Sequence, residues 1–148
     1  MLIDNNRLLT GLPMQPQQRI KVAICSPSMD REHADFATAL TGMMATSVTN
    51  VPVDCYYINH QNSVITDARN RLVQIALEWG AEWLLWLDSD LSFPNDTLIR
   101  LLRHNLDIVG ATYCQRAHPY SVMGHFKDGE KEDFSDVSLA ETHYLPGG

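Results

Sequence analysis

Residues 83–90 read WLLWLDSD, an apolar run that ends in two aspartates separated by one serine. An apolar run of this length predicts a buried β-strand, which we expect to cover residues 82–88. The paired acids are the unusual feature, because like charges repel each other and lose solvation as they leave bulk water. The stretch therefore predicts both a strand and a polar site at the end of that strand.

Strands and helices alternate on both sides of this stretch. Further apolar runs predict strands at residues 20–27, 53–59 and 107–113. Helices are expected between the strands, one starting near Asp30, one running from Ser63 to Gly80 and one starting at Pro94. The order βαβαβαβ predicts an α/β fold, Rossmann-like, with a mainly parallel sheet and helices on both of its faces.

The apolar spacing also predicts which side of each helix faces the sheet. The inward-facing residues are expected to be Phe36, Leu40 and Met43 in the first helix, Ile65, Ala68, Leu72, Ile75 and Trp79 in the second, and Leu98, Leu101 and Leu102 in the third. Beyond Arg116 the pattern loosens, although residues 120–126 could form another strand. The sequence is therefore most informative between residues 20 and 116.

The amino-acid composition limits the number of domains and the kinds of partner that are expected. The chain has 148 residues, of which 45% are hydrophobic and 20% charged, and this suits a single domain over residues 20–148 behind a polar leader, residues 1–19. The formal net charge is -7 and there is no run of Lys or Arg, which argues against a nucleic-acid partner. The three cysteines are far apart and odd in number, so neither a disulfide framework nor a zinc site is expected.

Hydropathy bears on the cellular location. No stretch reaches the roughly 18 apolar residues of a membrane span, and residues 1–19 lack the apolar segment of a signal peptide. No membrane span and a cytoplasmic location are therefore expected.

The two acids are predicted to lie in a ligand-binding region, because ligands of α/β folds bind at the carboxyl ends of the strands. If residues 88–90 are extended, Asp88 and Asp90 point to one side and Ser89 to the other. Two convergent carboxylates suit Mg2+ or Mn2+ that also binds the phosphates of a ligand. The alternative is a polar strand end, in which Asp90 or Ser92 caps the following helix, and short DxD strings also occur by chance.

Three segments follow one another in the sequence, ITDARNRLVQIALEWGA, WLLWLDSDLSFP and DIVGATYCQR. In this order they resemble the GT-A glycosyltransferases, most closely the family-2-like sugar transferases of bacteria, phages and large viruses. The likeness runs from about Lys21 to about Arg116, with a fainter echo in HYLPGG. The resemblance implies transfer of a sugar from a nucleoside diphosphate sugar of UDP or GDP type to the hydroxyl of a glycan or other acceptor. It also implies Mn2+ or Mg2+ as the cofactor.

The resemblance implies roles for individual residues. Asp90 would ligate the metal, Asp88 would contact the ribose or reach the metal through water, and Ser89 would belong to the same donor site. The base and ribose would be bordered by the loop residues Ser26, Pro27 and Ser28. Asn59 falls where the family often places a base contact, in place of the more common acid.

Arg69, in the segment TDARN, is the other residue that the resemblance singles out. Its planar guanidinium could hold Asp88 or a phosphate oxygen through two parallel hydrogen bonds. The alternative is a surface arginine on an amphipathic helix. His143 is a further candidate metal ligand, although most of the six histidines are expected at the surface.

No residue is assigned as the catalytic base, which an inverting enzyme would need. The family usually supplies this base beyond the point where the sequence ends, so the acceptor half is expected to be incomplete and the uncovered sheet edge to favour a homo-oligomer. Candidates by location alone are Glu130, Glu132, Asp133, Asp136 and Glu141. Two other classes stay open, a noncatalytic nucleotide-sugar-binding module and a haloacid-dehalogenase-like phosphatase, although the latter places its acid pair near the chain start.

Overall fold

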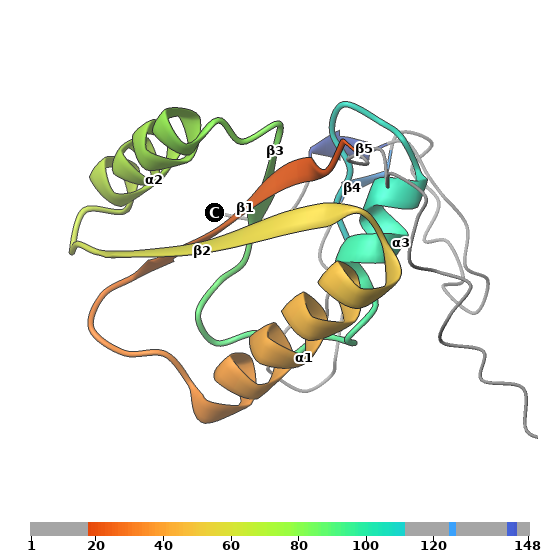
Figure 1. The fold of residues 1–148 in the computed structure, drawn as a ribbon. Helices are drawn as coiled ribbons and strands as arrows, with labels where there is room; N and C mark the ends of the chain where they lie inside the picture. Colours follow the sequence, from red (N-terminus) through yellow and green to blue (C-terminus); the bar gives the residue numbers. More distant parts are fainter. Residues whose placement is uncertain (1–17, 112–124, 127–141, 145–148) are drawn as a thin grey trace, which may run out of the picture. The chain divides into compact units, whose positions relative to one another are not determined.

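The structure is a computed structural model that describes residues 18–111, 125–126 and 142–144 (Figure 1). The chain divides into two compact units, residues 1–100 and 101–148. Within the described residues the elements are β1 (Ile20–Ser28), α1 (Ala34–Asn50), β2 (Val53–Gln61), α2 (Ile65–Trp79), β3 (Trp83–Trp86), α3 (Thr97–Arg103), β4 (His125–Phe126) and β5 (Thr142–Tyr144). The extent of the domain, residues 20–148, and the polar leader stay predictions.

The first unit is built on a three-stranded parallel sheet with the order β2-β1-β3. β1 lies between the other two strands, and residues 22–28 of it are all buried. A strand that is covered on both faces has no solvent side, which is why residues 22–25 form an apolar run without alternation. The alternation of strands and helices confirms the predicted α/β, Rossmann-like fold.

Helices α1 and α2 cover opposite faces of this sheet (Figure 1). On the α1 side, the predicted inward residues Phe36, Leu40 and Met43 are buried. On the other side, Leu72 and Ala76 of α2 form a buried cluster with Ala23, Cys25 and Ile58 of β1 and β2, and Ala68 is also buried. The periodicity of the two helices therefore predicted burial correctly at Phe36, Leu40, Met43, Ala68 and Leu72, whereas the burial of Ala76 was not predicted.

The start of α2 differs from the prediction and its end confirms it. Ser63 does not cap the helix, because Val64 is the N-cap and its N–H donates to Oδ1 of Asn62, at 2.9 Å. Gly80 ends the helix in the left-handed region, with a φ of 80°. The N–H groups of Gly80 and Ala81 donate to the carbonyls of Leu77 and Ala76, the arrangement of a Schellman motif.

Several predicted boundaries are wrong. α1 begins at Ala34 rather than near Asp30, α3 begins at Thr97 rather than Pro94, and β3 is confined to Trp83–Trp86 instead of residues 82–88. Ile65 is 48% exposed, because it opens α2 one turn before Ala68, which is the first buried residue of the helix. Leu98 is buried as predicted, whereas Leu101 and Leu102 are only partly buried.

The strand predicted at residues 107–113 is not found in the part that the structure describes. Residues 107–111 form no strand, and residues 112 and 113 lie outside the described ranges. Ile108 is 80% exposed, so this apolar run has no covering layer among the described residues. Part of the other late strand is present, because His125–Phe126 forms β4 and pairs antiparallel with β5.

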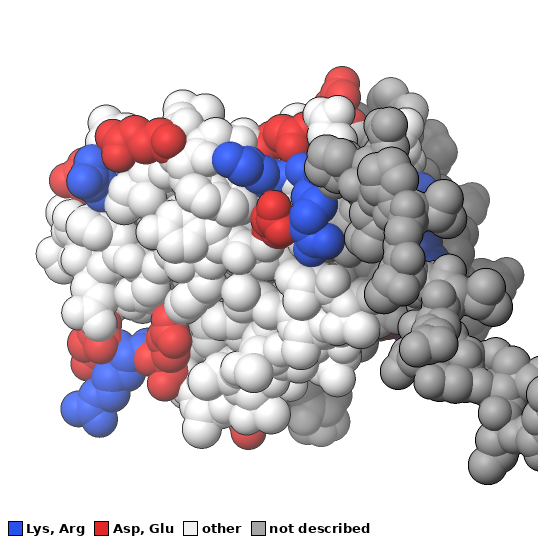
Figure 2. Space-filling model, viewed as in Figure 1, with Lys and Arg blue, Asp and Glu red and all other residues white. Residues whose placement is uncertain are grey.

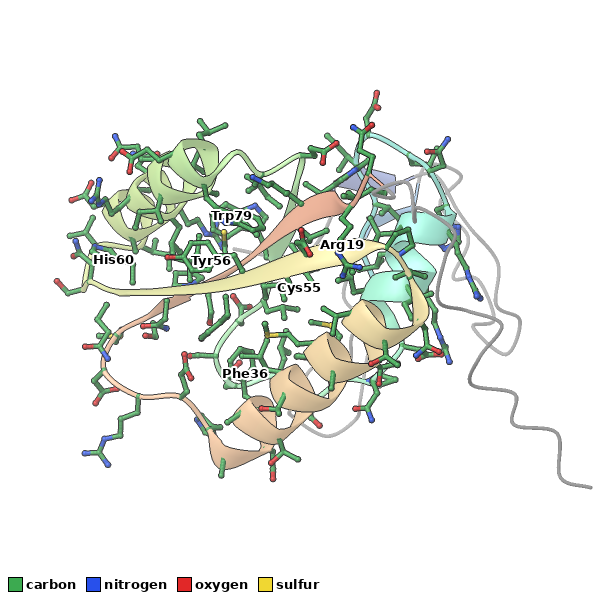
Figure 3. The ribbon with its side chains drawn as sticks, in the orientation of Figure 1. Arg19, Phe36, Cys55, Tyr56, His60 and Trp79 are labelled. Atoms are coloured by element: carbon green, nitrogen blue, oxygen red, sulfur yellow. The ribbon has the colours of Figure 1, made fainter. Side chains whose placement is uncertain are left out.

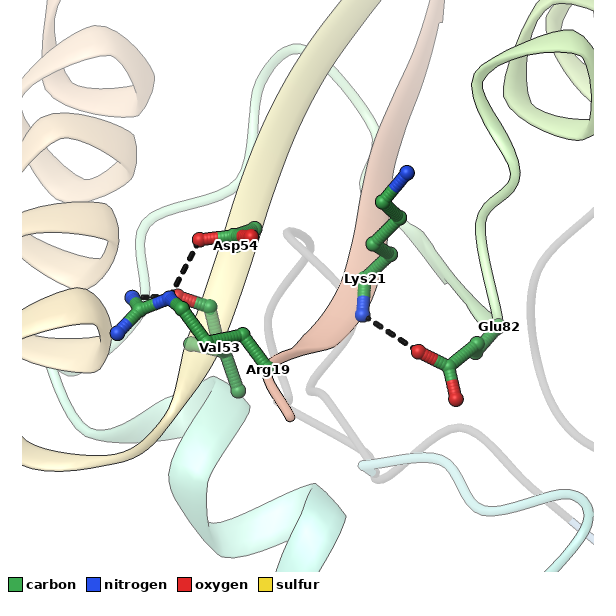
Figure 4. Close-up of polar contacts among 5 residues, drawn as sticks. All are labelled: Arg19, Lys21, Val53, Asp54 and Glu82. Carbon is green, nitrogen blue, oxygen red and sulfur yellow. Dashed lines mark hydrogen bonds and ion pairs between the residues drawn. The ribbon is translucent and has the colours of Figure 1, made fainter. Parts of the chain in front are cut away.

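Polar contacts fasten the amino ends of the strands (Figure 4). Nε of Arg19 donates to Oδ1 of Asp54 at 2.6 Å, and the guanidinium also donates to the carbonyl of Val53. The backbone N–H of Lys21 donates to Oε1 of Glu82, at 3.0 Å. An exposed ion pair such as Arg19–Asp54 contributes at most about 1 kcal/mol, so these contacts fix strand ends more than they add stability.

No helix in the described part of the chain is both long and apolar enough to cross a membrane. Charged side chains of both signs are interspersed on the face drawn in Figure 2, and much of that face is uncharged. Ligands of parallel α/β sheets bind at the carboxyl ends of the strands, which are described next.

Candidate functional site

The carboxyl ends of β1 and β2 bring together three of the predicted site residues. Ser26 pairs with Asn59 in the strand register. Nδ2 of Asn59 lies 3.0 Å from the carbonyl oxygen of Ser26 and 3.0 Å from Oγ of Ser28, and Oγ of Ser28 lies 3.3 Å from Oδ1 of Asn59. Parallel neighbours end at the same edge of a sheet, which is why two segments far apart in the sequence meet here.

Glu32, from the loop after β1, extends this polar cluster. Its Oε1 accepts hydrogen bonds from Nδ2 of Asn59, at 2.9 Å, and from the hydroxyl of Tyr57. The Glu32 residue is exposed, whereas Tyr57 is partly buried. We call Ser26, Ser28, Glu32, Tyr57 and Asn59 the β1–β2 polar cluster.

Tyr57 enters this cluster as a hydrogen-bond donor. Burial raises the pKa of Tyr57 to about 12, and the hydrogen bond to Glu32 acts in the same direction. The phenol is therefore protonated at neutral pH. Its ring lies 6.4 Å from that of Phe36, which Figure 3 shows on the side of α1 that faces the sheet.

Sequence reasoning missed Glu32 and Tyr57. Glu32 lies in a polar stretch, MDREH, between a strand and a helix, and only its place after β1 could have drawn attention to it. Tyr57 was expected in a strand, and its alternation with Asn59 along β2 puts both side chains on the α1 side of the sheet.

The side chains expected to border the nucleoside are less open than the resemblance implies. Ser26, Pro27 and Ser28 are all buried. Contact between these side chains and a ligand stays a prediction. The exposed residue of the β1–β2 polar cluster is Glu32.

The two acids of the DSD motif lie on a turn, which corrects the expected extended geometry. β3 ends at Trp86, and the carbonyl of Asp88 accepts a hydrogen bond from the N–H of Leu91 at 3.2 Å. The alternation that would place both carboxylates on one side applies only within a strand, so it does not fix their directions here. Asp88 and Asp90 are exposed, and Ser89 is partly buried.

This turn is fastened to the loop after β1. The backbone N–H of His33 donates to the carbonyl of Ser89 at 3.1 Å. Glu32 is the preceding residue, so the β1–β2 polar cluster and the acid turn are joined through one backbone hydrogen bond. The structure thus brings the predicted nucleoside loop and the predicted metal acids to the same edge of the sheet.

The segment that follows the acids packs on α1. The ring of Phe93 meets that of Phe36 edge to face, with centroids 6.0 Å apart and an interplanar angle of 80°. Gly42 faces Asn95 so closely that a Cβ at Gly42 would lie 2.3 Å from Oδ1 of Asn95. The observed position of the Asn95 side chain therefore requires that residue 42 has no side chain.

Arg69 lies on the opposite side of the sheet from α1. It is partly buried beside Ala68, and its guanidinium carbon is 5.9 Å from the centroid of the Trp86 ring. Trp86 precedes Asp88 by two residues, so the cation stands near the start of the acid turn. Hydrogen bonding of the Arg69 guanidinium to Asp88 or to a phosphate stays a prediction.

The donor set at the acid turn fits only part of a metal's coordination shell. Among the described residues no group of three or more His, Cys, Asp and Glu side chains could hold a metal ion. Mg2+ commonly takes one or two protein carboxylates and completes its shell with water and substrate phosphates, and oxygen donors also suit Mn2+. The pair Asp88 and Asp90 suits such an ion bound together with a phosphorylated ligand.

The remaining predicted residues belong to the second unit. The backbone of His143 lies in β5, and its role as a metal ligand stays a prediction. The candidate catalytic bases lie outside the described residues: Glu130, Glu132, Asp133, Asp136 and Glu141.

Comparison with known proteins found no match to this chain among protein-family models, curated proteins or solved structures. What the structure shows is a small α/β domain with a three-stranded parallel sheet.

Proposed function

We propose that this chain binds a nucleoside diphosphate sugar with Mn2+ or Mg2+ at the carboxyl ends of its strands, and that it is a glycosyltransferase of GT-A type. The observation that carries the proposal is the hydrogen bond between His33 and Ser89, which joins the acid turn to the loop after β1. A nucleotide needs both parts of such a site, acids that hold a metal on the diphosphate and polar groups that hold the nucleoside.

The proposed roles follow from the positions of the side chains. Asp90 would hold the metal directly, with Asp88 as a second ligand or as a partner of the ribose. When bound, the metal would offset the charge that develops on the departing diphosphate. Arg69, held near the ring of Trp86, would place a positive charge beside the same turn.

A noncatalytic nucleotide-sugar-binding module is the second candidate. It is favoured by the acid turn, whose two carboxylates suit a metal bound with a diphosphate, while no described residue is assigned as the base for the acceptor hydroxyl. A haloacid-dehalogenase-like phosphatase is a weaker candidate, because the acid pair follows the third strand of the chain rather than the first.

Calorimetry with UDP and with GDP tests the proposed binding, in the presence of Mn2+ or of EDTA. The parent protein is expected to bind at least one of them only with Mn2+. Asp90→Asn should weaken this binding by at least about tenfold with little change in melting temperature, since Asp90 is exposed. Glu78→Gln is the matched control, because it removes an exposed acid from the last turns of α2 and should leave the affinity unchanged.

Equal affinity with Mn2+ and with EDTA, or equal affinity of the parent and Asp90→Asn, would overturn the metal-dependent site. Release of UDP or GDP from the corresponding nucleotide sugar, stimulated by a glycan acceptor, then separates the two candidate functions. Stimulated release supports a transferase, whereas tight metal-dependent binding without release supports the binding module.

A further inference from the structure

β2 is an outer strand of the three-stranded sheet. β1 lies between β2 and β3, and within the described residues β2 pairs only with β1. Figure 1 shows β2 in front of β1, with α1 and α2 on either side of it and no described element of the first unit in front of it. The other outer strand, β3, has four residues, whereas β2 has nine. β2 therefore offers the longer edge, about 30 Å at about 3.3 Å per residue.

Two backbone hydrogen bonds show which groups of β2 point away from β1. The N–H of Ile20 donates to the carbonyl of Pro52 at 2.9 Å, and the N–H of Asn62 donates to the carbonyl of Ser28 at 3.1 Å. In a strand the N–H and C=O of one residue point to the same side, and the side alternates from residue to residue. Even-numbered residues of β2 therefore bond to β1, and odd-numbered residues direct their backbone groups outward. The outward-directed residues in the middle of the strand are Cys55, Tyr57 and Asn59.

The sequence of β2 does not protect this edge. Residues 53–61 read VDCYYINHQ, with no Lys, Arg, Pro or Gly and with one acid, Asp54. Natural proteins usually protect an exposed edge with Lys, Pro, a bulge or a short strand. The register of β2 with β1 is continuous, so β2 has no bulge. Figure 3 shows Cys55, Tyr56 and His60 along this strand, and in the same view much of the surface is uncharged (Figure 2). A long, regular and nearly uncharged edge favours pairing with another strand.

We propose that two copies of this chain pair through β2, antiparallel and related by a two-fold axis at Tyr57, so that their three-stranded sheets become continuous. The inference goes beyond the proposed function and does not rest on it, because it concerns the edge of the sheet rather than the ligand site. It assigns a surface to the homo-oligomer that the sequence led us to expect.

This two-fold axis makes the backbone of β2 complementary to itself. Tyr57 lies opposite Tyr57 of the partner subunit, and Cys55 lies opposite Asn59 of the partner subunit. All of these residues direct their N–H and C=O groups outward, so each facing pair can exchange two hydrogen bonds. A one-residue shift of one strand would bring outward-directed groups against groups that already bond to β1, so such a shift is excluded.

The side chains that face each other in this register are also complementary. Asp54 lies opposite His60 of the partner subunit, in a pair without backbone hydrogen bonds, where facing side chains come closest. Both lie on the α2 side of the sheet, as does Ile58, which packs in the cluster under α2. The imidazole can donate to the carboxylate of Asp54, which accepts one hydrogen bond from Arg19 and has lone pairs for others. The two-fold axis forms this contact twice.

A second copy fits this edge better than an unrelated extended peptide. A peptide would satisfy the same backbone groups by adding a strand. In a two-fold interface, however, one surface supplies both members of the contact between Asp54 and His60. A stable interface buries about 800 Å2 on each partner. Two paired strands supply only part of this area, so the uncharged surface beside β2 would supply the rest (Figure 2).

Sedimentation velocity over a concentration series measures the association, and His60→Asp tests the register. The parent protein is expected to dimerise. His60→Asp places two acids opposite each other at both symmetry-related contacts, so the dissociation constant should rise at least about tenfold. Gln74→Glu is the matched control, because it adds the same charge on an exposed residue of α2 and should leave the dissociation constant unchanged.

The double variant Asp54→His with His60→Asp restores the contact with its members exchanged. Its dissociation constant should return to within about threefold of the parent value, because acid and imidazole again face each other. Such a rescue requires the two positions to meet across the interface. It would not follow if His60→Asp only disturbed the folding of β2.

Amide hydrogen exchange followed by NMR locates the interface without any variant. The amides of Cys55, Tyr57 and Asn59 should become protected as the protein concentration rises, since they bond only to the partner subunit. The amides of Tyr56 and Ile58 bond to β1 and should be protected at every concentration.

Four results would overturn the inference. The first is a parent protein that stays monomeric while the three outward amides exchange rapidly. The second is protection of these amides in a monomer, because another segment of the chain would then cover β2. The third is protection only after an extended peptide is added, which would assign the edge to a peptide. The fourth is a dimer in which His60→Asp keeps the parent dissociation constant, because the proposed register would then be wrong.

Discussion

Gly42→Ala tests how the acid-bearing segment is held against α1. A Cβ at Gly42 would lie 2.3 Å from Oδ1, 2.8 Å from Cγ and 3.1 Å from Nδ2 of Asn95. All three contacts are with the far end of the Asn95 side chain, which is exposed, so rotation of this side chain toward solvent relieves them. Alanine at position 42 therefore requires Asn95 to leave its position.

Two opposing free energies decide the outcome. Replacing glycine by alanine inside a helix stabilises it by about 1 kcal/mol, while overpacking costs about 1–3 kcal/mol. Because the side chain that has to move is exposed and flexible, we place the overpacking near about 1 kcal/mol, at the low end of this range. The two effects then nearly cancel, and Gly42→Ala should change the free energy of unfolding by less than about 0.5 kcal/mol.

A double-mutant cycle with Asn95→Ala isolates this contact. In the Asn95→Ala background the obstacle is gone, so the same Gly42→Ala change should stabilise the protein by about 1 kcal/mol, a coupling of about 1 kcal/mol. Urea unfolding of the four proteins measures it. Stabilisation of about 1 kcal/mol by Gly42→Ala in both backgrounds, which is a coupling near zero, would refute the close approach of Asn95 to Gly42.

Three other predictions concern the core, the arginine and the tyrosine. Leu72→Ala should lower the free energy of unfolding by about 2–5 kcal/mol, because Leu72 is fully buried in the cluster under α2, and a loss below about 1 kcal/mol in urea unfolding would contradict that packing. Arg69→Lys keeps the charge but loses the planar contact with Trp86, so calorimetry should show weaker Mn2+-dependent UDP binding at a nearly unchanged melting temperature; unchanged affinity would show that the guanidinium of Arg69 does not contribute to binding. The pKa of Tyr57 is raised from 10.0 to about 12, so its protonated form contributes stability that is complete below pH 10 and lost as the pH rises toward 12. Between pH 10 and pH 12 the free energy of unfolding should fall less steeply with pH in Tyr57→Phe than in the parent, and parallel curves would contradict this contribution.

The sheet and its two long helices could be predicted because burial imposes a period on the sequence. β1 is buried on both faces and has an apolar run at residues 22–25, and α1 buries Phe36, Leu40 and Met43 at helical spacing. The meeting of Ser26, Ser28 and Asn59 also followed from the rule that parallel strands end at one edge. These features depend on local pattern and on a general property of the fold.

The parts that were missed depend on contacts that periodicity does not encode. An apolar run such as residues 107–113 does not specify a partner strand, and Ile108 is largely exposed. The acids lie on a turn because β3 ends two residues before Asp88, and hydropathy does not mark that end. The bond between Glu32 and Tyr57 joins a loop to a strand, so only the strand register and the path of the loop reveal it.

Anomalous diffraction from crystals grown with Mn2+ and UDP tests the central claim most directly, because the manganese signal locates the ion without reference to the expected site. We predict one strong peak in direct contact with the carboxylate of Asp90 and with oxygens of the diphosphate. A manganese ion bound elsewhere, with the diphosphate away from the turn that carries Asp88 and Asp90, would contradict the metal-dependent nucleotide site.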